Sequence, residues 1–168
     1  MPDELKDIEK DGTPLNILLV EDNESDIKIA QRAFAKSSMN TNVYVARDGE
    51  EALQFIRHAG KYKDKAQFPR PGIILLDIKM PKKDGFQVLK ELKSDPQYNF
   101  IPVIMLTSSK NEEDIVKSYR SGAASFIQKP ISYGSFLKVV DNFNYYWHII
   151  NKLPNPDLSS PESGVGSP

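Results

Sequence analysis

The chain has 168 residues, with 22 Lys and Arg against 23 Asp and Glu, and no cysteine. This length suits one domain with a sizeable core and leaves no room for a second. The balanced charge, without a lysine or arginine stripe, argues against a nucleic-acid partner. The missing cysteines exclude disulfides, thiolate metal sites and a cysteine nucleophile.

The two ends of the chain differ in composition from its middle. Residues 1–14 are predicted to be a charged extension, without the apolar region of a signal peptide, and residues 154–168 a disordered tail of prolines, serines and glycines. No stretch approaches the length of a membrane span. We therefore expect a cytoplasmic protein without a membrane partner, folded over residues 15–153.

Apolar runs and helical periodicities alternate along the middle of the chain. Strands are predicted at 17–20, 43–46, 73–76, 103–106 and 125–128. Helices are predicted to begin near Glu24, Asp48, Gly85 and Glu112, and a last helix to span about 132–151. The segment 61–72 breaks the periodicity and is predicted to be a surface loop far from the strand ends. His58 and His148 are expected at exposed helical positions.

This alternation predicts an α/β fold. Right-handed crossovers then favour a five-stranded parallel, doubly wound sheet of flavodoxin-like order, 2-1-3-4-5, with five helices. The switch point of such a sheet lies between its first and third strands. Ligands of open parallel sheets bind beyond the carboxyl ends of the strands at that point.

Acidic residues follow both of those strands. Glu21 and Asp22 come after the first, and Asp77 comes after the third. Three carboxylates gathered at one edge cannot all stay ionised unless a cation shares the site. Ligands that are all oxygen favour a hard cation such as Mg²⁺. The sequence therefore predicts a magnesium site here.

A hydroxyl and an ammonium follow two further strands. Thr107 ends the fourth strand and Lys129 follows the fifth, and both groups suit a phosphoryl group. Each residue alone has a plainer explanation: Asp22 or Thr107 as a helix cap, Asp77 as a turn former, Lys129 as a surface charge. Their shared position at strand ends, separated by crossover-sized segments, favours one common site.

With these residues in this order, the sequence resembles a response-regulator receiver domain over about residues 15 to 154. The resemblance implies that Asp77 is the phosphoacceptor and that Glu21 and Asp22 are the acidic pair of the metal site. It also implies that the backbone carbonyl of Lys79 is a metal ligand. Thr107 corresponds to the switch hydroxyl of the family.

The resemblance extends to the fifth strand. Phe126 stands where the family has its aromatic switch residue, often tyrosine, and a plain core aromatic is the alternative. Lys129-Pro130 matches the lysine-proline pair of the family, which implies a cis peptide bond between them.

The function implied is that of a single-domain two-component response regulator. Such a protein accepts a phosphoryl group from a sensor histidine kinase and signals by conformational change and protein–protein interaction. It is a phosphoacceptor that catalyses its own phosphorylation and dephosphorylation rather than an enzyme with turnover. The alternative is a receiver-like interaction module with phosphate-independent output.

Two other classes fit less well. A flavodoxin would need a phosphate-binding loop where this chain has acidic residues after its first strand. A haloacid-dehalogenase phosphohydrolase would need a second aspartate where this chain has Lys79.

Within the family, the sequence is most similar to the single-domain response regulators that partner bacterial phytochromes. The features that carry this similarity are Gly60-Lys61-Tyr62, Glu113-Asp114-Ile115 and the stretch from Trp147 to Pro154. Lys79, where that group often has asparagine, departs from the pattern.

The last helix has more apolar residues than one buried face can hold. We therefore predict a homodimer built on this helix with residues 112–120 and 125–128. Packing against the N-terminal segment is the alternative. The predicted interface residues are Tyr145, Tyr146, Trp147, Ile149 and Ile150.

Overall fold

The computed structural model describes residues 14–37, 40–108, 111–129 and 132–151, with side chains in the last helix as far as Phe143. Three predictions about the backbone lie outside these residues. They are the cis peptide bond at Lys129-Pro130, the N-terminal extension before Pro14 and the tail at 154–168. The side chains of the predicted interface residues, Tyr145, Tyr146, Trp147, Ile149 and Ile150, lie outside them too.

Five parallel strands form one sheet in the order β2-β1-β3-β4-β5. The strands are β1 (Leu15–Val20), β2 (Thr41–Ala46), β3 (Ile73–Asp77), β4 (Val103–Thr107) and β5 (Ser125–Gln128). The predicted fold class and strand order are confirmed. Each apolar run became a strand because β1, β3 and β4 are covered on both faces, as in parallel sheets generally.

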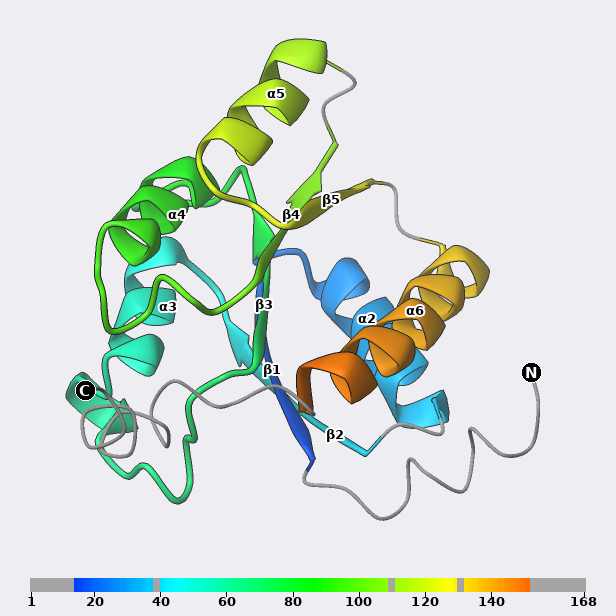
Figure 1. Cartoon of the computed structure of the whole chain (residues 1–168), viewed down its shortest axis with the longest axis horizontal. Helices are drawn as coiled ribbons and strands as arrows, with labels where there is room; N and C mark the ends of the chain where they lie inside the picture. Colours follow the sequence, from blue (N-terminus) through cyan, green and yellow to red (C-terminus); the bar gives the residue numbers. More distant parts are fainter. Residues whose placement is uncertain (1–13, 38–39, 109–110, 130–131, 152–168) are drawn as a thin grey trace, which may run out of the picture.

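Helices lie on both sides of this sheet, α2 and α6 on one side and α3 and α4 on the other (Figure 1). The described helices are α2 (Glu24–Lys36), α3 (Gly49–Ile56), η1 (Gly60–Tyr62, a 3-10 turn), α4 (Gly85–Lys93), α5 (Glu112–Arg120) and α6 (Tyr133–Asn151). None of the helices in the described part of the chain is long and apolar enough to cross a membrane.

Polar side chains fix where the helices begin. The Asn23 side chain accepts a hydrogen bond from the Asp26 backbone N–H, 3.0 Å away, at the start of α2. Asp84 forms a capping box with Gln87 at the start of α4. Such caps satisfy backbone donors that the helix itself leaves unpaired. They start α2 and α4 within a few residues of the strand ends, so the functional side chains lie in short connections.

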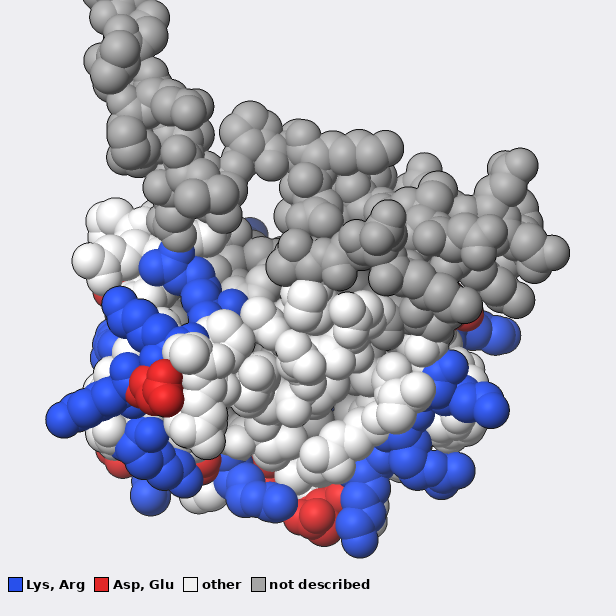
Figure 2. Space-filling model, turned by 90° about the horizontal axis from the view of Figure 1, so that it is seen from below, with Lys and Arg blue, Asp and Glu red and all other residues white. Residues whose placement is uncertain are grey.

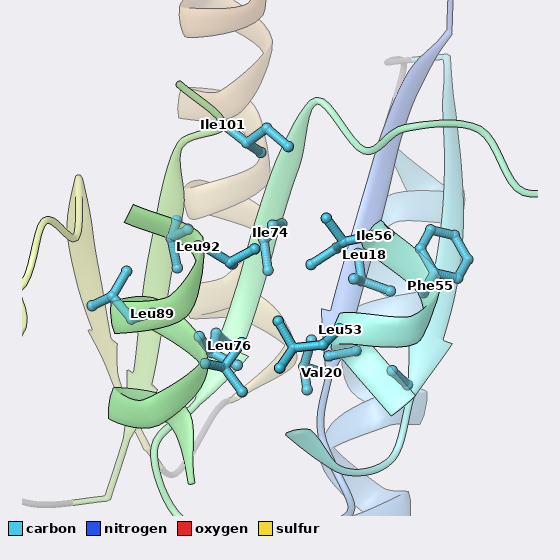
Figure 3. Close-up of a cluster of buried hydrophobic side chains, with 14 of the residues drawn as sticks. Leu18, Val20, Leu53, Phe55, Ile56, Ile74, Leu76, Leu89, Leu92 and Ile101 are labelled. Atoms are coloured by element: carbon cyan, nitrogen blue, oxygen red, sulfur yellow. The ribbon is translucent and has the colours of Figure 1, made fainter. Parts of the chain in front are cut away.

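Alternating side chains of the strands feed two cores. Leu18 and Leu76 point toward α3 and α4 and pack with Leu53, Leu89 and their neighbours (Figure 3). On the other face, β1 and β3 pack against α2 and α6. Fully buried leucine and isoleucine side chains each stabilise the fold by about 2 kcal/mol, so β1 and β3 rigidly support the residues at their carboxyl ends.

Gly85 allows α4 to begin directly beneath the end of β3. A Cβ atom at this position would overlap the carbonyl oxygen of Asp77 and would lie 2.8 Å from the Cα of Ile78. The Gly85 N–H also donates to the carbonyl oxygen of Ile78, at 2.7 Å. The absence of a side chain at Gly85 therefore helps to set the backbone position of Asp77.

The segment 61–72 is more than the surface loop that its composition predicts. Tyr62 is only 5% exposed, and its ring centroid lies 5.0 Å from that of Phe55 and 4.9 Å from that of Phe68. Its hydroxyl donates to the Glu51 carboxylate of α3. Residues 63–72 form no helix or strand and residues 63–67 are exposed, as predicted. The prediction missed only the burial of Tyr62 in a 3-10 turn, because the neighbouring lysines and prolines gave no sign of it.

The prediction of an exposed helical position for His58 was also wrong. It lies after the end of α3 with a φ of 55°, is half-buried, and its Nε2 atom is 2.9 Å from the carbonyl oxygen of Phe68. The histidine therefore turns the chain after α3 and links it to the segment 61–72. The side chain of His148 lies outside the described residues.

Figure 2 shows the distribution of charged side chains on one face of the molecule. On the face seen in Figure 2, Lys and Arg gather toward the margins around a largely uncharged centre. On the described part of this face, the basic side chains do not extend across the uncharged centre.

Candidate functional site

Four strands bring the predicted site residues to one edge of the sheet. Glu21 directly follows β1, and its N–H donates to the carbonyl oxygen of Ala46 at 2.9 Å. Asp77 and Thr107 are the last residues of β3 and β4. Lys129 follows β5, and its N–H donates to the carbonyl oxygen of Thr107 at 2.7 Å. Hydrogen bonds between strands therefore set the backbone positions of the site.

The three acidic residues form a cluster. One carboxylate oxygen from each of Glu21, Asp22 and Asp77 lies within 4.8 Å of the others. Glu21 is fully buried, Asp77 is 6% exposed and Asp22 is exposed. The cluster is thus buried on the side of the sheet and open to solvent on the side of Asp22.

The Lys129 ammonium joins this cluster. Its Nζ atom lies 2.6 Å from Glu21 Oε2, 3.0 Å from Asp26 Oδ2 and 3.3 Å from Asp77 Oδ2. The lysine side chain is only 12% exposed. Ion pairs at this depth are screened far less than surface pairs, so they hold the ammonium within reach of Asp77.

Asp26 was not predicted as a site residue. It lies in the first turn of α2, and the sequence around it reads simply as the start of a helix. The only signal in the sequence was that a second acidic residue follows Asp22 after four positions. That spacing does not reveal a contact with a lysine more than a hundred positions away.

Burial sets the protonation of the cluster. Burial raises the pKa of Glu21 to about 7, with a further upward contribution from the charge of Asp77, and the hydrogen bond from Lys129 opposes both. Burial also raises the pKa of Asp77, against the charge of Lys129. For Lys129, burial acts to lower the pKa, but the hydrogen bonds to Glu21 and Asp26 outweigh it, and the pKa lies above its ordinary value.

These directions predict how stability depends on pH. The folded chain holds a proton on Glu21 up to about pH 7, whereas the unfolded carboxyl has its ordinary pKa of 4.5. Glu21 therefore contributes stability that is full below about pH 4.5 and is lost as the pH rises through about 7. Urea titrations in the presence of a chelator measure the unfolding free energies of the wild type and of Glu21→Gln. The difference, wild type minus variant, should fall as the pH rises over this window.

A divalent cation should reverse that loss, since it binds the ionised carboxylates and opposes their repulsion. If the wild type instead gained stability relative to Glu21→Gln as the pH rose without metal, the assignment of Glu21 as the proton-binding group would be wrong.

The donors of the cluster fit a hard divalent cation. All three side chains offer carboxylate oxygens, their spacing allows one ion to contact all of them, and the open side at Asp22 leaves room for water or a ligand. One ammonium beside three buried or half-buried acids also leaves excess negative charge for a cation to compensate. The predicted acidic pocket is therefore suited to a metal ion.

The remaining predicted residues surround the cluster. Thr107 is 3% exposed at the end of β4, and Lys79 is exposed beyond β3, with its N–H 3.4 Å from Asp77 Oδ1. Phe126 is half-buried in β5, with its ring edge-on to Tyr119 at 5.9 Å. A pocket of about 440 Å³ adjoins the site and is lined by Asp22, Ile78, Lys79, Met80, Pro81 and Asp84.

The fold and this arrangement of acids and lysine define a signalling receiver. The family model for the response regulator receiver domain matches residues 17–141, and the chain belongs to this family. Members of the family are phosphoacceptors, and phosphorylation by a histidine kinase is their standard role.

Several relatives are similar over nearly their whole length. The response regulator Rcp1 of Synechocystis is 35% identical over 146 residues, which cover 87% of this chain and 97% of Rcp1. The crystal structure of the phosphorylated cyanobacterial phytochrome response regulator RcpA has a TM-score of 0.74 at 39% identity and covers 85% of this chain and 100% of RcpA. The Mn²⁺-bound form of Rcp1 has a TM-score of 0.72 at 36% identity, over 84% of this chain and 100% of that structure.

Proposed function

We propose that this chain is a response regulator that accepts a phosphoryl group on Asp77 in a magnesium-dependent reaction. The observation that carries the proposal is the position of the Asp77 carboxylate, which is clustered with Glu21 and Asp22 and lies 3.3 Å from the Lys129 ammonium. We also propose residues 15–153 as the receiver domain. We propose a cytoplasmic location for the protein.

In the proposed reaction, a carboxylate oxygen of Asp77 attacks phosphorus. A P–O bond forms to Asp77 as the bond from phosphorus to the donor breaks, and the leaving group departs with the electron pair. Glu21, Asp22, Asp77 and the backbone carbonyl of Lys79 would hold Mg²⁺. When bound, the ion would compensate negative charge on the carboxylates and the phosphoryl oxygens.

Two other side chains would act on the phosphoryl group directly. Lys129 would pair with one phosphoryl oxygen, and the Thr107 hydroxyl would donate a hydrogen bond to another. These groups belong to the receiver itself, which supports the proposal that the chain promotes its own phosphorylation and dephosphorylation. A movement of Thr107 toward the phosphoryl group would leave space beside β5, and Phe126 is the proposed aromatic of that switch.

Asp22→Ala is expected to weaken Mg²⁺ binding and phosphorylation together. The substitution removes one direct ligand and leaves the buried part of the cluster intact, so the affinity for Mg²⁺ should fall about tenfold or more. Titration of Mg²⁺ by calorimetry, followed by labelling with acetyl phosphate at each Mg²⁺ concentration, measures both effects. Unchanged metal affinity would count against Asp22 as a direct ligand.

The proposed phosphodonor is a sensor histidine kinase of the phytochrome class. This proposal is supported by the similarity to RcpA, which is described as a cyanobacterial phytochrome response regulator. A receiver-like module with phosphate-independent output is the alternative. The two differ in whether binding to a downstream protein changes when Asp77 is phosphorylated.

A homodimer through α6, α5 and β5 remains a proposal. Apolar residues after Phe143 in the sequence of α6 support it, together with the exposed side chains of Val116 and Tyr119 on α5. Sedimentation at micromolar concentration should show a dimer that Tyr146→Glu or Ile149→Glu weakens without loss of folding. A monomer at every concentration, with and without phosphorylation, would contradict the dimer.

A further inference from the structure

Asp26 is the one contact of the Lys129 ammonium that the proposed reaction does not use. We propose that Asp26 is a positioning residue that holds this ammonium beside Asp77 while the other contacts of the ammonium exchange. The inference rests on the proposed function, because it concerns the same phosphoryl transfer.

The Lys129 ammonium has three partners, one for each of its N–H donors. A lysine ammonium has three N–H donors, and three carboxylate oxygens lie near Nζ, at 2.6, 3.0 and 3.3 Å from Glu21, Asp26 and Asp77. Each oxygen comes from a different residue, so each donor can have one partner. Loss of any one partner would leave the long lysine side chain less well aimed.

Asp26 does not belong to the acidic cluster. Among the described residues, the group that could hold a metal consists of Glu21, Asp22 and Asp77 and does not include Asp26. A cation and a phosphoryl group would therefore draw on Glu21 and Asp77 and leave the contact with Asp26 in place. Asp26 is the partner that can stay with Lys129 throughout the reaction.

Asp26 is held in place by the start of α2. Its backbone N–H donates to the Asn23 side chain at 3.0 Å, and its carboxylate projects from the first turn of α2 with only 18% of the side chain exposed. The next residue, Ile27, is 1% exposed and packs in the core. The anchor is thus built on a helix, whereas Lys129 lies in the connection after β5.

The test compares phosphorylation rates for Asp26→Asn and a matched control. Asp26→Asn keeps the size of the side chain and removes the charge, so the initial rate with acetyl phosphate and saturating Mg²⁺ should fall about tenfold. The matched control is Glu24→Gln, in the same helical turn. Glu24 pairs with Arg47 at 2.7 Å on the exposed surface, and its loss should leave the rate within about twofold.

Metal binding separates positioning from a general disturbance of the site. Asp26→Asn should keep its Mg²⁺ affinity within about threefold of the wild type, because Asp26 is not one of the clustered donors. Asp26→Glu, which restores the charge one methylene further out, should recover part of the rate. Equal losses of metal affinity and rate, without recovery in Asp26→Glu, would overturn the inference.

A double-mutant cycle tests whether Asp26 acts through Lys129. In a Lys129→Met background, Asp26→Asn should change the rate by less than about twofold, because the group that it positions is absent. A full tenfold effect of Asp26→Asn in that background would overturn the inference. If Asp26→Asn lowers the melting temperature strongly, Asp26→Ser replaces it in the same cycle.

The outcomes also separate this inference from the proposed function. A wild-type rate for Asp26→Asn would overturn the role of Asp26 and leave phosphoryl acceptance by Asp77 standing. A wild-type chain that takes up no phosphoryl group would overturn both.

Discussion

Asp77→Asn is expected to abolish phosphorylation while leaving the chain folded. The amide has almost the shape of the carboxylate, but its oxygen carries no charge with which to attack phosphorus. The substitution also removes one negative charge from the three clustered acids, and the relief of their repulsion offsets the lost attraction to Lys129, so the melting temperature of the metal-free protein should not fall. After incubation with acetyl phosphate and Mg²⁺, phosphate-affinity electrophoresis should show a shifted band for the wild type and none for the variant.

Asp64→Asn is the matched control for this experiment. Asp64 lies in the segment 61–72, where its carboxylate accepts a hydrogen bond from the Ala66 N–H at 3.0 Å, away from the acidic cluster. Its loss should leave the shifted band unchanged. A normal shift for Asp77→Asn would mean that another residue accepts the phosphoryl group.

Lys129→Met should slow phosphorylation about a hundredfold, because one charged donor to the phosphoryl group is lost. It should also lower the unfolding free energy of the metal-free protein by about 3 kcal/mol, since it leaves buried carboxylates without a cation. Mg²⁺ binding should persist, because the clustered carboxylates remain. Stopped-time labelling and urea unfolding, each with and without Mg²⁺, measure these effects.

Lys93→Met offers a second, half-buried lysine as a control. The Lys93 Nζ atom donates to the carbonyl oxygens of Asn99 and Ile101, at 2.9 and 2.8 Å, near the start of β4 and thus at the opposite end of the strands from the site. Its loss should affect stability and leave the labelling rate unchanged. If Lys129→Met slowed labelling no more than Lys93→Met, the proposed contact between Lys129 and the phosphoryl group would be wrong.

The sequence was sufficient to predict the architecture because the apolar runs are buried on both faces of a parallel sheet. Such runs leave little ambiguity about strand positions, and parallel strands with right-handed crossovers leave few topologies. The positions of Glu21 and Asp77 could be predicted for the same reason. Residues that directly follow strands meet at one edge, whatever the details of the connections.

Contacts made by side chains from distant elements were harder to predict. The sequence around Asp26 indicates only the start of a helix. The contact of Asp26 with Lys129 depends on how α2 is positioned beside the end of β5. Tyr62 lies among charged residues, so its burial against Phe55 could not be recognised from local composition. Both contacts arise from tertiary packing, which the short-range patterns of hydrophobicity do not encode.

Magnesium-dependent phosphoryl acceptance is tested most directly by the intact mass of the wild-type chain after incubation with acetyl phosphate. With Mg²⁺ present, we expect the addition of one phosphoryl group, which peptide mapping locates at Asp77. With the metal chelated, the added mass should be absent or strongly reduced. No added mass with Mg²⁺, or the same addition with chelator, would contradict magnesium-dependent phosphoryl acceptance at this site.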